Sequence, residues 1–235
     1  MNLNQLFRYY HPAGWPFMGI FAAATIVLSL FSGKLAMIGL ILTAWCFYFF
    51  RDPQRVTPTK PGLVVSPADG KIVAIKEVVP DSDLGLGETP RTRISIFLNV
   101  FDVHVNRIPT DSIVRETHYR PGKFVNAALD KASVDNERMA LVLQLQGDHP
   151  YDGKTMGVVQ IAGLIARRII CDARENSTFK AGERYGIIRF GSRADIYLPV
   201  GMKPMVMVGQ YALGGETVLA DATSTEDARQ GEVRE

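Results

Sequence analysis

Two uncharged apolar stretches, residues 15–31 and 35–50, dominate the hydrophobic pattern at the start of the chain. Only Ser32, Gly33 and Lys34 separate them, and such a short connector containing Gly predicts a tight helical hairpin. At about 1.5 Å per residue each helix is about 25 Å long, slightly shorter than the hydrocarbon core of a bilayer, which is about 30 Å. The hairpin can therefore either cross a membrane or enter it as a re-entrant loop.

The ends of the two stretches favour an uncleaved membrane anchor. A secretory signal peptide has one apolar core followed by a small-residue cleavage site, whereas the second stretch here ends in the bulky run FYFF at 47–50. Trp15 and Trp45 lie near the outer ends of the hairpin, where amphipathic rings favour the membrane interface. We therefore expect localisation at the cell membrane.

Basic residues predict the orientation of this anchor. The turn of the hairpin carries a single cation, Lys34, whereas the outer flanks carry Arg8, Arg51, Arg55 and Lys60. Because positive charge favours the cytoplasmic side, both ends of the hairpin and the rest of the chain are expected to be cytoplasmic.

After residue 61 the pattern changes to short β-branched runs separated by Gly, Pro and Asp. These runs predict a β-rich sandwich or barrel instead of a parallel α/β sheet. There are eleven of them: 63–65, 71–79, 93–99, 103–107, 112–120, 140–146, 155–161, 167–171, 185–189, 194–198 and 205–208. Residues 124–132 are the one segment with helical character, so the predicted fold class is mainly β (α+β).

The same pattern divides the chain into three parts. Residues 1–52 form the membrane-anchoring hairpin, and residues 53–220 form the β-rich domain. The Pro-rich segment 53–61 is expected to stop the second helix and to act as a linker. Residues 221–235 hold five acids and two Arg with few apolar residues, so they are expected to be a flexible acidic tail.

Charge and cysteine content narrow the choice of partners. The chain has 26 Lys+Arg and 24 Asp+Glu, and its net charge of +2 lies entirely within the first fifty residues. A charge-balanced body lacks the basic excess typical of nucleic-acid binders, so no nucleic-acid partner is expected. Cys46 and Cys171 form no CxxC motif and the four histidines lack the spacing of a zinc site, so no metal is expected either.

Two segments, 65–73 and 208–220, are similar to the strand-turn-strand phrases of biotinyl/lipoyl-type barrels. This similarity leaves open a membrane-tethered carrier or binding module without catalysis. In a carrier the attachment residue would be Lys131, in the phrase Leu129-Asp130-Lys131-Ala132. Lys131 lies in the helical segment, however, where a carrier has an exposed hairpin tip.

Two polar segments of the body contain acids, and one of them also contains a histidine. The turn 66–70, SPADG, contains Asp69, which could orient a histidine by accepting its ring N–H or could simply form an Asx-turn. In the phrase 101–107, FDVHVNR, strand alternation places Asp102, His104 and Asn106 on one face. Such a face suits a functional site, although a solvated sheet face has the same pattern.

The dipeptide Gly191-Ser192 follows a strand-like run and precedes another. Gly-Ser is usually a turn. A hydroxyl held against the carbonyl of Gly191 could instead attack its own backbone if a base took the proton.

Together these phrases resemble the phosphatidylserine decarboxylase family, in its short membrane-anchored branch. The resemblance covers nearly the whole chain, and the order and spacing of its motifs make the combination specific. The motifs are Phe49-Phe50-Arg51-Asp52-Pro53, Ser66-Pro67-Ala68-Asp69-Gly70, Asp102-Val103-His104, Asn136-Glu137-Arg138, Lys180-Ala181-Gly182-Glu183 and Phe190-Gly191-Ser192.

The resemblance implies a proenzyme that cuts itself. Ser192 would attack the Gly191 carbonyl, and elimination and hydrolysis of the ester would turn Ser192 into an N-terminal pyruvoyl group. The products would be a large chain, 1–191, and a small chain, 192–235, which stay together as a heterodimer, with further oligomerisation left open. His104 would act as the base and Asp69 would orient it.

The resemblance also implies the reaction. The pyruvoyl group, with no metal and no pyridoxal phosphate, would form a Schiff base with the amine of phosphatidylserine and accept the electrons released by decarboxylation. His104 would return a proton to Cα, giving phosphatidylethanolamine. An ether-linked archaeal lipid with the same serine head is an alternative substrate.

Two positions depart from the family pattern. Many members have a second His three residues after the first, where this chain has Arg107, so the base for self-cleavage is left open. Arg107 could instead bind the carboxylate or phosphate of the substrate, since a guanidinium fork suits both. Arg193 stands where better-known branches carry Thr or Ser, which suggests the short branch.

Overall fold

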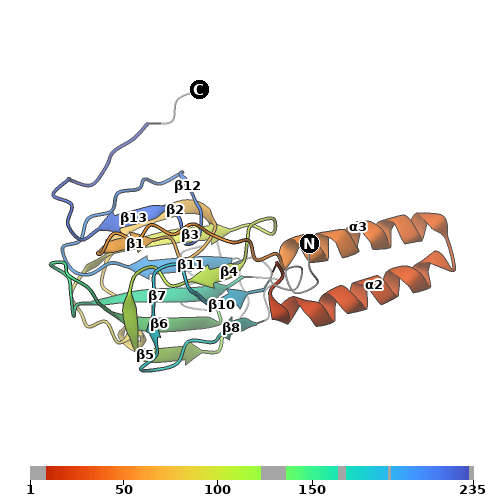
Figure 1. Ribbon diagram of the computed structural model, residues 1–235, viewed down its shortest axis with the longest axis horizontal. Helices are drawn as coiled ribbons and strands as arrows, with labels where there is room; N and C mark the ends of the chain where they lie inside the picture. Colours follow the sequence, from red (N-terminus) through yellow and green to blue (C-terminus); the bar gives the residue numbers. More distant parts are fainter. Residues whose placement is uncertain (1–8, 123–135, 164–167, 190–191, 233–235) are drawn as a thin grey trace.

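A computed structural model describes residues 9–122, 136–163, 168–189 and 192–232 of the chain. Gly191, Lys131 and the helical segment expected at 124–132 lie outside the described residues. The model has a β-rich body with an apolar helical hairpin at its N-terminal end (Figure 1), which confirms the predicted fold class.

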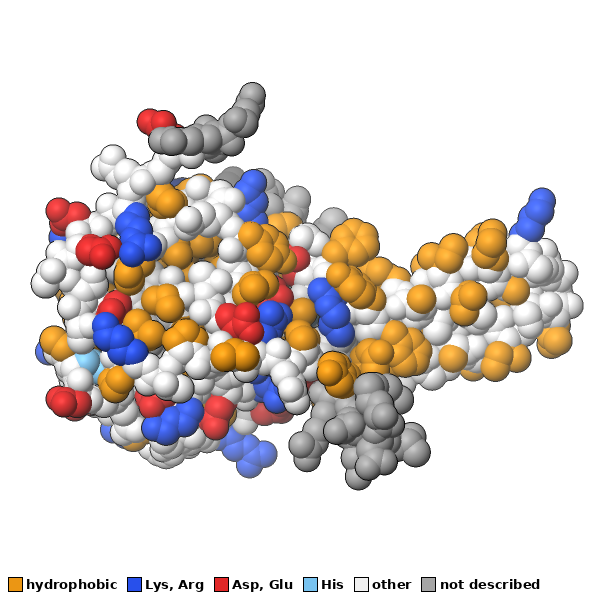
Figure 2. Space-filling view, turned by 45° about the horizontal axis from the view of Figure 1, so that its top comes forward, with side chains coloured by type: hydrophobic (Ala, Val, Ile, Leu, Met, Phe, Trp, Pro, Cys, Tyr) orange, Lys and Arg blue, Asp and Glu red, His pale blue; other side chains and the backbone are white. Residues whose placement is uncertain are grey.

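The hairpin projects from one end of the body (Figure 1) and consists of α2, Trp15–Ser29, and α3, Gly33–Phe49, preceded by the 3₁₀ helix η1, Pro12–Gly14. Ser32 caps α3, because its side chain accepts a hydrogen bond from the backbone N–H of Lys34 at 3.2 Å. Hydrophobic side chains cover much of the projecting hairpin (Figure 2). The stretch Pro12–Ser29 is long and apolar enough, with a mean hydropathy of 1.4, to cross a membrane.

The two helices pack closely through small residues. Gly39 on α3 faces Thr25 on α2, and a β-carbon at Gly39 would lie 2.8 Å from the Thr25 hydroxyl. The hydroxyls of Thr25 and Thr43 form a hydrogen bond of 2.9 Å between the helices. Close approach through small residues with a polar contact is typical of helix pairs in lipid.

The strands of the body form three sheets. The largest has the order β12-β2-β3-β11-β7-β6-β5-β9, a second has the order β4-β10-β8, and β1 pairs with β13. Their bounds are β1 Leu63–Val65, β2 Gly70–Val78, β3 Arg91–Leu98, β4 Val105–Arg107, β5 Ser112–Arg120, β6 Arg138–Leu145, β7 Thr155–Ala162, β8 Ile169–Cys171, β9 Thr178–Phe179, β10 Arg184–Ile188, β11 Ser192–Tyr197, β12 Tyr211–Ala212 and β13 Val218–Asp221, with a 3₁₀ turn, η2, at Ser82–Leu84. Every predicted run except 205–208 overlaps a strand.

The two barrel-like segments lie side by side. β12 pairs with β2, with Ala212 opposite Gly70, and β13 pairs with β1. The central strand β11 is buried along its whole length between β3 and β7, and its Ile196 belongs to the main hydrophobic core. A strand buried in this way gives a rigid support for any side chain at its end.

The root of the hairpin is packed into the body. Phe49 and Phe50, both 0% exposed, form a hydrophobic cluster with Val103, Val105 and Ile187 from β4, β10 and the loop before β4. Burial of two Phe side chains contributes several kcal/mol, at about 25 cal/mol per Å². The hairpin therefore has a fixed attachment to the smaller sheet.

Residues 53–61, predicted to be a linker between anchor and body, lie against the body instead. Arg55 pairs with Asp69 at 2.7 Å, Lys60 pairs with Asp221 at 2.6 Å, and the N–H of Val56 donates to Glu216 at 3.0 Å. Prolines in this segment leave its backbone extended but do not prevent side-chain pairing. At the other end, Asp221 belongs to β13, and residues 225–232 after it are exposed.

Candidate active site

Ser192 is the first residue of β11, at the end of the large sheet nearest the predicted cleavage bond. It lies between Leu98 of β3 and Ala162 of β7 and is 0% exposed. Its Oγ has no hydrogen-bond partner among the described residues. A buried hydroxyl without a partner is unusual in a folded protein and calls for an explanation, of which a role in chemistry is one.

Asp69 reaches the same end of the sheet from the turn before β2. Gly70 pairs with Ala212 and packs against the end of β3, where a β-carbon would clash with the carbonyl of Phe97. The φ of Gly70 is +151°, so only glycine suits this close approach. The glycine of the SPADG turn thus allows Asp69 and Ser192 to flank the same end of β3.

The carboxylate of Asp69 is buried and already bound. It accepts hydrogen bonds of 2.7 Å from the Arg55 guanidinium and of 2.7 Å from the N–H of Gly214. Burial raises the pKa of Asp69, while both of these donors act in the opposite direction. No hydrogen bond joins Asp69 to His104 in the described part of the chain, so its role as the orienter of His104 stays a prediction.

His104 is fully buried in the segment between β3 and β4. Its Nδ1 lies 3.0 Å from the carbonyl oxygen of Asp102, and its ring packs against Phe49 with the ring centroids 4.3 Å apart. A carbonyl can only accept, so Nδ1 must carry the proton of the neutral ring. This leaves Nε2, which has no hydrogen-bond partner among the described atoms, as a free acceptor.

Burial lowers the pKa of His104 to about 4, with a smaller contribution from Arg51 in the same direction. The imidazole is therefore neutral at neutral pH, which is the form a general base requires. The carbonyl of His104 accepts from the N–H of Ile188 at 3.2 Å, and Ile188 ends the strand that leads towards Ser192. The backbone thus ties His104 to the segment that precedes the predicted cleavage site.

Arg107 has a structural partner in the described chain. Its guanidinium donates to Asp52 at 3.1 Å, to the carbonyl of Pro53 at 3.0 Å and to the carbonyl of Gly182 at 2.9 Å. Asp52 also pairs with Arg184 at 2.5 Å. Arg107 is 6% exposed, so its hydrogen-bonding capacity towards a substrate is largely taken up, and substrate binding by Arg107 stays a prediction.

Several supporting residues were not predicted from the sequence. Asn136 donates to the carbonyl of Ala162 at 2.7 Å, and the N–H of Ala162 donates to the carbonyl of Glu137 at 2.9 Å. These two bonds hold the strand end beside Ser192. Asn136 and Glu137 belong to the motif Asn136-Glu137-Arg138, which was visible in the sequence. The sequence did not show that this motif would contact Ala162.

Arg193 and Asp195 form a second unpredicted pair beside Ser192. Alternation along β11 places both side chains on one face, and two contacts of 2.9 Å join them. Their side chains are 2% and 1% exposed, so the departure from the family pattern at Arg193 is matched by a buried carboxylate.

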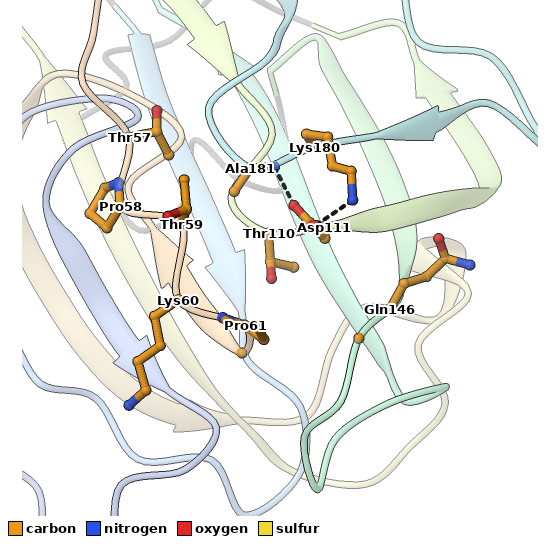
Figure 3. Close-up of a pocket in the computed structure, with 12 residues that line it drawn as sticks. Thr57, Pro58, Thr59, Lys60, Pro61, Thr110, Asp111, Gln146, Lys180 and Ala181 are labelled. Atoms are coloured by element: carbon orange, nitrogen blue, oxygen red, sulfur yellow. Dashed lines mark hydrogen bonds and ion pairs between the residues drawn. The ribbon is translucent and has the colours of Figure 1, made fainter.

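A pocket of about 340 Å³ lies apart from these residues, between the 57–62 segment and the loops around Asp111 and Lys180 (Figure 3). Asp111 accepts from Lys180 at 2.7 Å and from the N–H of Ala181 at 2.9 Å, so the charges of Asp111 and Lys180 in this pocket satisfy each other. None of the residues that carry the predicted chemistry lines this pocket. Within the described ranges no group of three or more His, Cys, Asp or Glu residues could hold a metal ion.

Comparison with known proteins identifies the family. The profile of the family described as phosphatidylserine decarboxylase matches residues 42–220. The chain belongs to the phosphatidylserine decarboxylase family. This confirms the resemblance indicated by the motifs, and the family's enzyme class is the decarboxylase predicted from them; no comparison favours a carrier module.

The relatives in this family match almost end to end. A phosphatidylserine decarboxylase proenzyme of Cereibacter sphaeroides is 54% identical over 232 residues, which are 99% of this chain and 98% of the relative. Proteins of the same name from Paramagnetospirillum magneticum and Rickettsia bellii are each 53% identical, over 94% and 93% of this chain and 90% and 92% of their own lengths. The similarity therefore includes the N-terminal hairpin.

Proposed function

We propose that this chain is a proenzyme that cuts itself between Gly191 and Ser192 and then decarboxylates phosphatidylserine to phosphatidylethanolamine. The observation that carries the proposal is Ser192, a buried serine without a hydrogen-bond partner at the strand end that the family motif Phe190-Gly191-Ser192 occupies. The names of the relatives support both the proenzyme and the lipid substrate.

Self-cleavage begins at the hydroxyl of Ser192. As Nε2 of His104 takes the hydroxyl proton, Oγ bonds to the carbonyl carbon of Gly191; the Gly191–Ser192 C–N bond then breaks as His104 returns that proton to the nitrogen, which gives an ester and a free amine. Loss of the Cα proton then expels the Gly191 carboxylate from Cβ. Water hydrolyses the resulting enamine to a ketone and releases ammonia.

The residues around Ser192 fit the group that this sequence leaves behind. A pyruvoyl group has one heavy atom fewer than the serine residue that it replaces, so it fits the same space, and the buried end of β11 keeps bulk water away from it. When present, its ketone supplies the electron sink that decarboxylation of an amino acid needs. No residue outside Ser192 is required to hold it, since it remains part of the small chain, 192–235.

His104 then serves the decarboxylation as a proton carrier. With Nδ1 committed to the Asp102 carbonyl, Nε2 is the nitrogen that can deliver a proton to Cα of the lipid head after carbon dioxide leaves. Asp69 lies at the same sheet end, and its raised pKa makes it a second candidate for proton transfer.

The apolar hairpin supports a location of this chemistry at a membrane. A two-tailed phospholipid is not free in water, and the root of the apolar hairpin packs directly on the segment that carries His104. We assign the body to the cytoplasmic side, because the basic residues Arg51, Arg55 and Lys60 follow the hairpin while its turn has only Lys34.

Intact mass tests the cleavage. The full chain expressed in a bacterial membrane is expected as two chains, 1–191 and a 192–235 chain that begins with a pyruvoyl group. Ser192→Ala should stay uncut, whereas the matched control Ser95→Ala should cut normally, because Ser95 is also a buried β-strand serine with an unpartnered Oγ. A single full-length wild-type chain would favour the carrier alternative and refute the proposal.

Release of carbon dioxide tests the reaction. Purified two-chain enzyme should release it from diacyl phosphatidylserine, and an ether-linked phosphoserine lipid in a parallel assay tests the alternative substrate. A cut enzyme that acts on neither lipid would contradict the decarboxylase while leaving the self-cleavage intact.

A further inference from the structure

Two arginines face each other beside the predicted cleavage bond. β10 and β8 pair with Ile188 opposite Ile169, and the N–H of Arg189 donates to the carbonyl of Arg168 at 3.4 Å, so the register places Arg189 opposite Arg168. Cross-strand neighbours have their β-carbons about 5 Å apart, and like charges in that position destabilise a sheet. Such a pair calls for a negatively charged partner.

The described residues provide little of that charge. Neither arginine has a carboxylate within 4.0 Å among the described ion pairs, and the buried Nε of Arg189 has no hydrogen-bond partner. The acid that acts electrostatically on Arg189 is Glu137, which is 5% exposed and accepts from the Tyr119 hydroxyl at 3.1 Å and more distantly from the N–H of Ile169. One carboxylate committed to other donors leaves the pair with an excess positive charge.

The pair also lies at the membrane end of the body. The guanidinium of Arg189 is 5.4 Å from the ring centroid of Phe17 on α2, and that ring stacks on Phe50 at the root of the hairpin. Figure 2 shows basic side chains on the body close to this root. Lipid phosphates lie just outside the hydrocarbon core, at the depth where an apolar hairpin leaves the bilayer.

The distance to the reaction centre is also suitable. Arg189 precedes Ser192 by three residues, so their α-carbons are at most about 10 Å apart, within the combined reach of an Arg side chain and a lipid head. In a phosphoserine lipid the phosphate is joined to the reacting Cα through only the serine oxygen and Cβ. Arg107, the other candidate for this role, is occupied by Asp52.

We propose that Arg168 and Arg189 together bind the phosphodiester of the lipid head group and so position its serine next to Ser192 and His104. This inference rests on the proposed function and adds the site that recognises the phosphate. Arg189, half-buried against Phe17, supplies the fixed guanidinium, and the exposed Arg168 supplies the second charge. Guanidinium groups suit this ligand because their paired N–H donors match two phosphate oxygens.

Steady-state kinetics with monomeric dihexanoyl phosphatidylserine test the site without a membrane surface. Hydrogen bonds to charged groups contribute about 1.5–3 kcal/mol, so Arg189→Gln should raise KM about 10- to 100-fold, with kcat changed less than about twofold. Arg168→Gln should raise KM by a smaller factor, and Arg189→Lys should lie between wild type and Arg189→Gln because it keeps the charge but loses the fork. The matched control is Arg115→Gln, an exposed strand arginine on β5, which should behave as wild type.

A second measurement, of thermal stability with and without a ligand, does not depend on self-cleavage. The uncut Ser192→Ala chain should gain thermal stability from sn-glycero-3-phosphoserine, and the added Arg168→Gln substitution should abolish most of that gain. Without ligand, the Arg168→Gln change should not lower the melting temperature, since it removes a like-charge neighbour.

Unchanged KM in both Arg168→Gln and Arg189→Gln would overturn the inference. So would a loss of binding to phosphatidylglycerol vesicles with unchanged KM for the monomeric lipid, because that result assigns the arginines to neighbouring anionic lipids. Failure of the proposed function is distinguishable, since it would appear as wild-type enzyme that neither cuts nor releases carbon dioxide.

Discussion

The ion pair between Arg107 and Asp52 gives the sharpest test of what this arginine does. The sequence suggested a substrate ligand, whereas the structure has its guanidinium in hydrogen bonds to Asp52, Pro53 and Gly182. Arg107→Gln keeps a polar side chain but removes the charge and the fork. If Arg107 is structural, the variant should lose stability and keep its affinity for substrate.

The expected loss of folding stability in Arg107→Gln follows from the burial of the Arg107–Asp52 pair. Both side chains are 7% exposed, and removing one partner of a buried pair costs about 3–5 kcal/mol. Arg184 remains beside Asp52 at 2.5 Å and keeps the carboxylate partly compensated, which favours the lower end, about 3 kcal/mol. For a chain of this size each kcal/mol shifts the melting temperature by about 2–4 °C, so a decrease of about 6–12 °C is expected.

Thermal unfolding of the detergent-solubilised protein measures this shift, with the exposed Arg115→Gln as the control. The double variant Asp52→Asn with Arg107→Gln should lose less than the sum of the two single variants, because each single change leaves a buried charge behind. An unchanged melting temperature together with a large rise in KM would refute this reasoning and return Arg107 to the substrate.

Three further predictions concern His104 and the hairpin. The pKa of His104 in the folded chain, about 4, lies below its ordinary value of 6.5, so the neutral ring contributes about 3 kcal/mol to folding stability. This contribution is complete above pH 6.5 and is lost as the pH falls towards 4. His104→Gln should therefore flatten the fall in melting temperature across that window, and an unchanged slope would refute the assignment. Phe49→Leu removes the ring packed on His104 and should slow self-cleavage several-fold in a gel time course. Phe21→Leu, in the same hydrophobic cluster, is the control and should not slow it. Equal cleavage rates in the two variants would show that the ring contact has no role. Gly39→Val forces a β-carbon onto Thr25 and should lower the free energy of unfolding of the full chain by about 1–3 kcal/mol. Gly19→Val meets no neighbour within 4 Å and should lower it little. Equal losses of stability in the two variants would contradict the helix contact.

The local pattern of the sequence was enough to predict the elements. The hairpin follows from two uncharged stretches, and its bounds differ by about two residues because Ser32 caps α3 at Gly33. The run 205–208 was predicted to be a strand but forms none, and only the neighbouring Pro204 makes an isolated bridge to Ala220. β9 and β12 have two residues each, which is too short for an alternating pattern to be visible.

The site was predictable only in part, because its contacts join distant segments. The motifs predicted Ser192, Asp69 and His104, but the strand order that brings Asp69 and Ser192 to the same end of β3 is a property of the folded sheet. Asp52 and Arg107 are 55 positions apart, and no spacing rule pairs them. The contact between Arg107 and Asp52 is therefore a long-range pairing that a local sequence pattern does not predict.

The segment from the last residue of α3 onwards connects the hairpin to the candidate site. Within seven residues, Phe49 packs on the ring of His104, Asp52 pairs with Arg107, and Arg55 pairs with Asp69. Each contact joins the end of the hairpin to a different strand or turn around the site. Three such contacts within seven residues hold the hairpin root in a fixed position relative to the body. Any change in the position of the hairpin root would therefore act on His104 and Asp69 directly, so this root forms one wall of the candidate active site.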